Sequence, residues 1–245
     1  MSIKILQRSI MKSKYIFKIQ VFTLFIIFCG SLSKAFSQNS SNLKITESDL
    51  KVLENGDLNS AARVLYRMRQ IYKNEGNKQI IQAIPALIKR ANNDLSFMEK
   101  EKGIFDGEGE LLGDVIWALS VTGDERVEPV LLDVMLSDKV FSSNTSKGFL
   151  NIGHSALKKI LEALKSVNVN KKRSVALTLA QMSEFDTAGT YFTENDKKII
   201  QEEMLKLIKE ENELTRNAAV RALGYFGDKS TIPILTRIIH KIFTH

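Results

Sequence analysis

The chain has 245 residues, and its 35 Lys and Arg against 28 Asp and Glu give a formal net charge of +7. Six of the basic residues and no acidic residue lie in residues 1–37, so positions 38–245 hold 29 basic and 28 acidic residues and are close to neutral. This distribution argues against an extended nucleic-acid-binding surface, while one cysteine and a hydrophobic fraction of 44% exclude a disulfide scaffold and a disordered chain.

Residues 1–37 have the three parts of a secretory signal peptide. Three lysines at positions 12, 14 and 18 precede an apolar run over 19–29, and the small residues Ala35 and Ser37 stand before the expected cleavage site. The run is about half the length of the roughly 20 apolar residues that span a membrane. We therefore predict cleavage after Ser37 and export to the periplasm or the cell exterior.

Three points remain open for this segment. Translation begins at Met1 or at Met11, and the second start gives a shorter basic region. The segment could instead stay uncleaved as an N-terminal anchor. Lipid attachment at Cys29 is a further alternative, although Phe28 stands where bacterial lipoproteins have a small residue. After cleavage the mature chain would have no thiol for catalysis, for a redox pair or for metal binding.

Beyond a flexible, polar lead-in at 38–45, apolar residues recur at steps of three and four, the spacing of one face of an amphipathic helix. Thr46 with Asp49, and Thr193 with Asp196, have capping-box spacing and predict two helix starts. Gly56 predicts a helix end, because glycine accepts the left-handed conformation. No stretch alternates with period two over enough residues to form a sheet. We predict an all-α fold with helices near 46–55, 61–72, 80–91, 111–122, 125–136, 154–166, 171–183, 194–210, 214–225 and 229–243.

Two segments of the chain resemble each other at a constant offset of 104 residues. We interpret their shared Gly as the end of a first helix, their Asp as the N-cap of a second helix, and their Pro as part of its opening turn. The offset fits three units of about 35 residues, a length typical of helical repeats. The coinciding residues are Ala118/Ala222, Leu119/Leu223, Gly123/Gly227, Asp124/Asp228, Pro129/Pro233 and Leu131/Leu235.

The second of these segments resembles the HEAT-like repeat of the phycobilin-lyase type, whose pattern is roughly V-R-x-x-A-x-x-A-L-G-x-x-G-D-x-x-x-x-P-x-L. Residues 215–235 follow this pattern and depart from it chiefly at Thr215; residues 111–131 follow it less closely, with Leu112 for the arginine and Ser120 for the first glycine. The resemblance implies an α-solenoid of about four to five antiparallel helix pairs, forming one domain over 46–245. It implies less about function, since such repeats occur in interaction scaffolds, chromophore lyases and a few enzymes.

The residue patterns of HEAT-like enzymes are not found in this chain. Di-iron hydroxylases of this type have His-Glu dipeptides, whereas His154, His240 and His245 have no glutamate after them. An exported chain fits poorly with a bilin lyase, and no P-loop, glycine-rich dinucleotide turn or Ser-His-Asp order occurs. We therefore predict no catalytic residue, no metal ion and no cofactor. His154 is expected to be a surface or capping residue, with no carboxylate spaced to join it.

Trp117 is the first candidate residue for partner binding. It aligns with Arg221 at the offset of 104, at a position that is usually polar in such repeats. An exposed tryptophan there would suit a binding hot spot. Alternatively, the long segment 137–153 folds back and covers Trp117 with Phe141 or Phe149, and we favour this second interpretation.

Two further groups are candidates for partner binding. A basic group concentrates positive charge in one helix hairpin and suits an acidic partner. An apolar pair belongs to a wide apolar stripe in the last helix and predicts end-on association, including self-association. The basic group is Lys158, Lys159, Lys172 and Arg173, and the apolar pair is Ile242 and Phe243.

These patterns together predict a non-catalytic protein-interaction scaffold in the cell envelope, which binds an unknown protein partner along a curved face. The alternative is a groove-binding or lyase-like protein for a small hydrophobic ligand. Aromatic and carboxylate side chains converging on a groove would favour that alternative. A third interpretation is a structural element of a larger envelope assembly without a separable activity.

Overall fold

The structure is a computed structural model that describes residues 43–100, 108–137, 142–166 and 169–243. Within these ranges it describes the backbone but not the side chains of 99–100, 108, 142, 166, 170 and 238–243. Ile45–His245 forms one compact unit, and the description below concerns that unit. The predicted signal peptide and Phe141 lie outside the described residues.

The described residues form helices and no β-strand, which confirms the all-α prediction. Two 310 helices, η2 (Ile80–Ala83) and η3 (Glu125–Val127), lead into α4 and α6. The α-helices are α2 (Glu47–Asn55), α3 (Leu58–Glu75), α4 (Ile84–Lys100), α5 (Glu108–Ser120), α6 (Glu128–Leu136), α7 (Ser142–Ile152), α8 (His154–Ser166), α9 (Val169–Phe185), α10 (Glu194–Leu207), α11 (Glu213–Phe226) and α12 (Ile232–Phe243).

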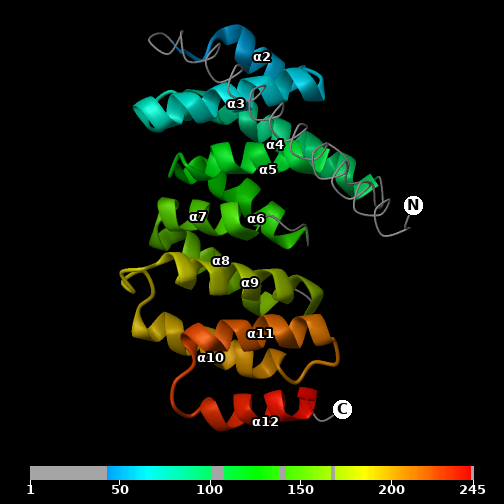
Figure 1. Cartoon of the computed structure of the whole chain (residues 1–245), viewed down its shortest axis with the longest axis vertical. Helices are drawn as coiled ribbons and strands as arrows, with labels where there is room; N and C mark the ends of the chain where they lie inside the picture. Colours follow the sequence, from blue (N-terminus) through cyan, green and yellow to red (C-terminus); the bar gives the residue numbers. More distant parts are fainter. Residues whose placement is uncertain (1–42, 101–107, 138–141, 167–168, 244–245) are drawn as a thin grey trace, which may run out of the picture. The chain divides into compact units, whose positions relative to one another are not determined.

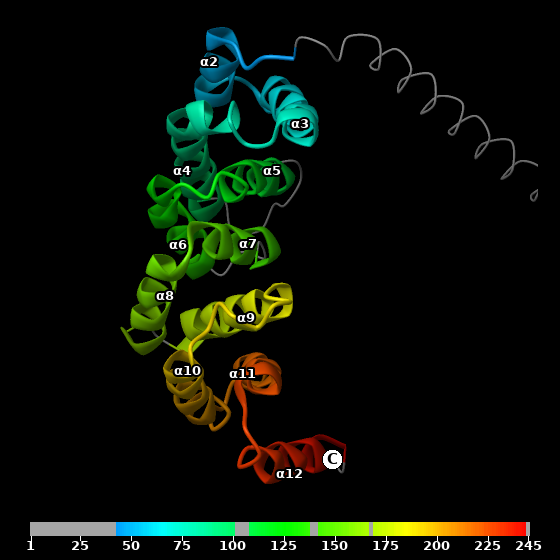
Figure 2. The same cartoon turned by 90° about the vertical axis from the view of Figure 1, so that its left-hand side faces the viewer.

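The helices are arranged in two layers (Figure 2). We call α3, α5, α7, α9 and α11 the odd layer, and each of them contacts the next one in that series. The even layer contains α2, α4, α6, α8 and α10, and each packs against the odd helix that follows it. In the described part of the chain, five helix pairs thus stack in sequence order and are followed by α12 (Figure 1). This arrangement confirms the predicted α-solenoid, and the step from α5 to α11 spans three pairs, as the internal offset predicted.

One hydrophobic core runs through all five pairs, because each pair buries its apolar face on the next. Both layers contribute side chains with no exposed surface, and these occupy the positions whose periodicity predicted the helices. Examples are Leu65 of α3, Leu87 of α4, Leu112 of α5, Leu131 of α6, Leu157 of α8 and Leu179 of α9.

The turn between α5 and α6 confirms the predicted roles of Gly and Pro, but not that of Asp. Gly123 ends the first helix with a φ of 65°, a left-handed conformation that favours glycine. Asp124 accepts a hydrogen bond from the backbone N of Arg126 at 3.0 Å and so caps η3, whereas the predicted N-cap position of α6 is held by Val127. Pro129 is the second residue of α6, where its missing N–H costs no intrahelical bond.

The equivalent turn between α11 and α12 uses the same residue types with a different backbone. Gly227 has an ordinary φ of −76°, but a Cβ there would lie 2.4 Å from the carbonyl oxygen of Leu223. Asp228 accepts a hydrogen bond from the backbone N of Ser230 at 2.8 Å. The proline is again the second residue of its helix, as it is in α4 and α6. The shared Gly-Asp-Pro pattern is therefore confirmed as a helix-to-helix turn.

Both predicted capping boxes are formed. At α2, the Thr46 hydroxyl accepts a hydrogen bond from Asp49 N at 3.2 Å and the Asp49 carboxylate accepts one from Thr46 N at 2.8 Å, and the pair at α10 does the same. Gly56 ends α2 as predicted, but the predicted left-handed conformation is wrong, because its φ is −76°. A Cβ at Gly56 would lie 2.5 Å from the Val52 carbonyl oxygen, and this close approach explains the glycine.

Periodicity predicted no helix in the long segment 137–153, but residues 142–152 form helix α7. Its sequence is rich in Ser, Thr, Asn and Gly, which are weak helix formers. Tertiary packing overrides this preference: Phe149 is fully buried, and Gly148 lies against α5 and α6, where a Cβ would meet Leu131 Cδ1 at 2.6 Å and Ser120 Cβ at 3.0 Å.

The same substitution should have opposite effects at two glycines inside helices. Gly148→Ala should lower the free energy of unfolding by roughly 1–3 kcal/mol, because overpacking outweighs the gain in helix propensity. Gly224→Ala in α11 should raise it by up to about 1 kcal/mol, because an added Cβ there meets no atom within 4 Å. Denaturant unfolding followed by circular dichroism measures both changes. Two changes of the same sign would contradict the close packing of α7.

Candidate functional site

Trp117 of α5 is half-buried, and two residues of α3 lie against its indole ring. The guanidinium carbon of Arg69 lies 4.1 Å from the ring centroid, a cation–π geometry. The ring of Tyr72 meets the indole edge-on, with centroids 5.7 Å apart and planes at 90°. Residues of α3 therefore lie against the indole. Phe149, one of the two predicted covering residues, is buried in the core as part of α7, and the other, Phe141, lies outside the described residues.

Arg69 joins Trp117 to a carboxylate. Its Nη2 lies 2.5 Å from Oδ1 of Asp114, which is one turn before Trp117 on α5. The Arg69 and Asp114 side chains retain 36% and 40% of their exposed surface, so solvent screens this ion pair. Its main effect is to fix the guanidinium over the indole.

Two tyrosines extend this cluster along α3. Tyr66, one turn before Arg69, is 53% exposed, and Tyr72 is 38% exposed. Tryptophan, tyrosine and arginine are the residue types most enriched at protein-binding hot spots. Sequence reasoning identified Trp117 but missed its α3 partners, because the segment around α3 shows only helical periodicity and carries no motif residue that would place it beside α5.

The internal offset places Arg221 of α11 at the position of Trp117, and the two residues make equivalent contacts. Arg221 Nη2 lies 3.0 Å from Oε2 of Glu184 on α9, the preceding helix of the odd layer. Trp117 likewise contacts α3, the preceding helix of the odd layer. This position of the repeat therefore reaches the neighbouring pair, with a charged contact in one case and an aromatic one in the other.

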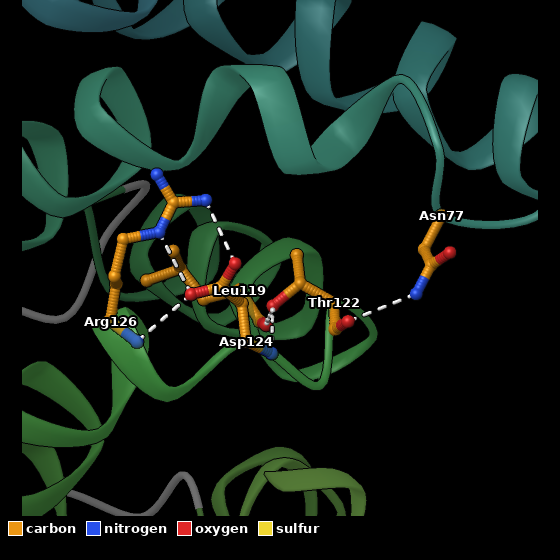
Figure 3. A network of polar contacts seen from close by, with 5 residues as sticks. All are labelled: Asn77, Leu119, Thr122, Asp124 and Arg126. Carbon is orange, nitrogen blue, oxygen red and sulfur yellow. Dashed lines mark hydrogen bonds and ion pairs between the residues drawn. The ribbon is translucent and has the colours of Figure 1, made fainter.

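Polar contacts from neighbouring segments fix the end of α5 next to this cluster (Figure 3). Asn77, just after α3, donates from Nδ2 to the carbonyl oxygens of Thr122 at 2.9 Å and Val121 at 3.2 Å. The Thr122 hydroxyl donates to the Leu119 carbonyl at 2.7 Å. The two bonds from Asn77 satisfy carbonyl groups just after the end of α5, and they set the position of α5 relative to α3.

Asp124 completes this network from the other side of the turn. Its carboxylate accepts hydrogen bonds from Nε and Nη2 of Arg126, both at 2.8 Å. Hydrogen bonding from the Arg126 side chain and backbone lowers the pKa of Asp124 to about 2. The carboxylate is thus ionised over the whole physiological range and remains an acceptor for the turn.

The predicted basic group is divided between two consecutive helices, α8 and α9, which contact each other. Lys159 of α8 lies 2.6 Å from Oε1 of the buried Glu128, and that carboxylate raises the pKa of Lys159. Lys158 is exposed beside it. Lys172 and Arg173 are half-buried near the beginning of α9.

Ile242 and Phe243 belong to α12, but their side chains lie outside the described part of the structure. At the other end of α12, Ile232 is 59% exposed and Ile234 is 37% exposed. Their equivalents at the offset of 104, Glu128 and Val130 of α6, are buried. The beginning of α12 therefore exposes apolar surface where the beginning of α6 does not.

A cleft of about 290 Å³ opens between α4 and α6 at the start of α9. Two leucines contribute apolar surface, one aspartate and one lysine contribute charge, and no aromatic side chain lines it. The lining residues are Asn92, Leu95, Ser96, Asp133, Leu136, Ser137 and Lys171.

His154 is an exposed residue at the start of α8, as predicted, but a carboxylate does lie near it. Its Nε2 is 3.6 Å from Oδ2 of Asp196, which also caps α10. Among the described residues no group of three or more His, Cys, Asp or Glu side chains is arranged to hold a metal ion. No helix in the described ranges is both long and apolar enough to cross a membrane.

Comparison with known families finds one match. Residues 215–239 match the family model of the PBS lyase HEAT-like repeat. The matched segment covers most of α11, the Gly227-Asp228 turn and the first part of α12, and it confirms the HEAT-like repeat that the sequence pattern predicted. Comparisons with curated proteins and with solved structures gave no match.

The Asp124 cap should stabilise the fold in a pH-dependent way. Asp124→Ala should lower the free energy of unfolding by about 1 kcal/mol at neutral pH, the usual cost of losing a helix cap. Because the folded state lowers the pKa of Asp124 from 3.8 to about 2, this stabilisation is present above pH 3.8 and is lost as the pH falls toward 2. Urea unfolding at several pH values measures the difference. Asp133→Ala, at an exposed position of α6, should change stability by less than about 0.5 kcal/mol.

Proposed function

We propose that the chain is a non-catalytic protein-interaction scaffold that is exported to the cell envelope, in the periplasm or outside the cell. The support for a scaffold is the HEAT-like repeat and the stacked helix pairs, which present side chains along an extended surface. The support for export is the signal-peptide pattern of residues 1–37.

The observation that carries the proposal is the cluster of Arg69, Tyr72 and Trp117 on the odd layer. All three retain exposed surface, and the indole is held by two side chains of a different helix pair. A rigid, partly exposed aromatic group lowers the conformational entropy lost on binding. Trp117 also packs against the core, but the exposed surface of the three groups is available to a partner.

The alternative of a small hydrophobic ligand has less support. The cleft between α4 and α6 would be its site, but that cleft has no aromatic wall, and its lining mixes leucines with amide, hydroxyl and charged groups. Sites for hydrophobic molecules are predominantly apolar and aromatic.

End-on self-association through α12 is a second part of the proposal. The exposed Ile232 and Ile234 support it, because they add apolar surface to a helix whose last turn contains Ile242 and Phe243. Sedimentation across micromolar concentrations should show a dimer or larger species. A monomer throughout that range would remove this part of the proposal.

Crosslinking and affinity purification from the cell envelope test the scaffold. The tagged wild-type chain should recover one protein reproducibly, and Tyr72→Gln combined with Trp117→Gln should reduce its recovery by at least about tenfold, as expected for hot-spot residues. Tyr225→Gln is the matched control, because Tyr225 of α11 is an aromatic residue of the odd layer with 44% exposure. Equal recovery by both variants would remove the Trp117 cluster from the interface, and a co-purifying small molecule without a protein would favour the ligand-binding alternative.

Export is tested by the N-terminus of the mature protein. Cleavage after Ser37 should leave Gln38 as the first residue, and substitution of Ala35 by a bulky residue should block processing, because signal peptidase needs small residues there. Mass spectrometry of the protein from the envelope fraction measures both. An intact N-terminus in that fraction would favour the uncleaved anchor.

A further inference from the structure

We propose that the exposed surface of α3, together with Trp117, is the docking site for an acidic segment of a partner protein. This proposal rests on the scaffold function proposed above and names the chemistry of the partner. We call the surface the α3 face, and it consists of Arg63, Tyr66, Arg69, Tyr72 and Lys73 of α3 with Trp117 of α5.

The charge of α3 is the first argument. The helix contains four basic residues and one acidic residue, Glu75. Two of the basic residues have carboxylate partners: Arg67 lies 3.0 Å from Asp49, and Arg69 is paired with Asp114. Arg63 and Lys73 are exposed, and neither forms an ion pair with another described residue. The α3 face therefore has two positive charges that the neighbouring helices do not compensate.

The spacing of these residues is the second argument. Positions 63, 66, 69 and 72 follow one another at steps of three, and position 73 is four residues after position 69, so each of these pairs lies side by side on the helix surface. The uncompensated charges stand at the two ends of the series, and the tyrosines stand between them, on either side of Arg69. An acidic segment lying along α3 would place carboxylates at Arg63 and Lys73 and apolar groups against the tyrosines.

The fixed position of Trp117 is the third argument. Its indole is held between Arg69 at 4.1 Å and the edge of Tyr72, and Arg69 is itself held by Asp114. The anchor is thus already in place before a partner binds, which reduces the entropic cost of association. Flanking charges then raise the rate of encounter with a partner of opposite charge.

A nucleic acid fits this surface less well than an acidic protein segment. The carboxylate of Asp114 lies within the face and is 40% exposed, where it would repel a phosphate backbone. A nucleic-acid site also needs a continuous basic track, whereas positions 38–245 are close to neutral. A protein segment can place an uncharged residue opposite Asp114, and a phosphodiester chain cannot.

The single tryptophan of the chain makes the proposal directly testable, because all indole fluorescence comes from Trp117. The full chain is titrated with a copolymer of L-glutamate and L-alanine, whose uncharged residues can lie opposite Asp114, and, separately, with single-stranded DNA of equal charge, at low and at physiological salt. The copolymer should change the Trp117 emission with an affinity that falls as salt rises, and it should bind more tightly than DNA. Arg63→Glu combined with Lys73→Glu should weaken this binding at least about tenfold.

The matched control is Lys165→Glu combined with Lys198→Glu. These two lysines are exposed on α8 and α10, in the other layer, and the change in net charge is the same. The affinity of this control for the copolymer should stay within about twofold of the wild-type affinity. Circular dichroism establishes that both variants keep their helix content, so a loss of binding is not a loss of fold.

Three results would overturn the proposal: no response of Trp117 to the copolymer, equal weakening in both charge variants, or DNA binding as tight as that of the copolymer. The affinity purification from the cell envelope distinguishes an error in the docking site from an error in the proposed scaffold function. If the variant Arg63→Glu with Lys73→Glu still recovers the same protein as the wild type, the scaffold function stands and the α3 face is not the docking site. If no variant and no wild-type protein recovers a partner, the scaffold itself fails.

Discussion

Each helix pair has an apolar face that it cannot bury by itself, and the rest of the structure depends on burying that face against the next pair. The resulting core takes side chains from α2 to α11 without interruption. This constraint explains why the chain can include a helix as poor in helix-forming residues as α7. Phe149 fills the layer between pairs, and Gly148 lets α7 approach α5 and α6 to contact distance. Burial of the layer, rather than local propensity, therefore decides that residues 142–152 are helical.

Stacking also requires hydrogen-bond donors for the carbonyl groups at the ends of the buried helices, because an unpaired carbonyl that is removed from water destabilises the fold. At the end of α5 both neighbouring segments supply these donors: Asn77 donates to carbonyl groups just after the helix, and Asn151 of α7 donates to the Ser120 carbonyl at 2.9 Å. The end of α7, the next helix of the odd layer, has a similar donor, since the Tyr191 hydroxyl donates to the Gly153 carbonyl at 2.7 Å. These bonds are directional, so they set how each pair is placed along its neighbour, which apolar packing alone does not.

The features that sequence predicted are those that act within one helix pair. Periodicity predicted ten of the described helices, and the Gly-Asp-Pro turns and both capping boxes are local arrangements of residues close in sequence. The features it missed arise between pairs. Helix α7 owes its existence to Phe149 and Gly148, and the cover of Trp117 comes from Arg69 and Tyr72, which lie 48 and 45 residues away along the chain.

The comparison of Trp117 with Arg221 suggests where specificity resides in this chain. The two residues occupy the same position of the repeat and both reach the preceding helix of the odd layer, yet one makes an aromatic contact and the other an ion pair. The motif residues around them keep Ala, Leu, Gly, Asp and Pro at matching places, because these residues build the pair and its turn. Position 117 is not one of these matching residues, since its equivalent is Arg221. A tryptophan at that position packs against the core and lies under Arg69 beside the exposed Tyr72, so it adds an aromatic group to the α3 face, where that group meets solvent.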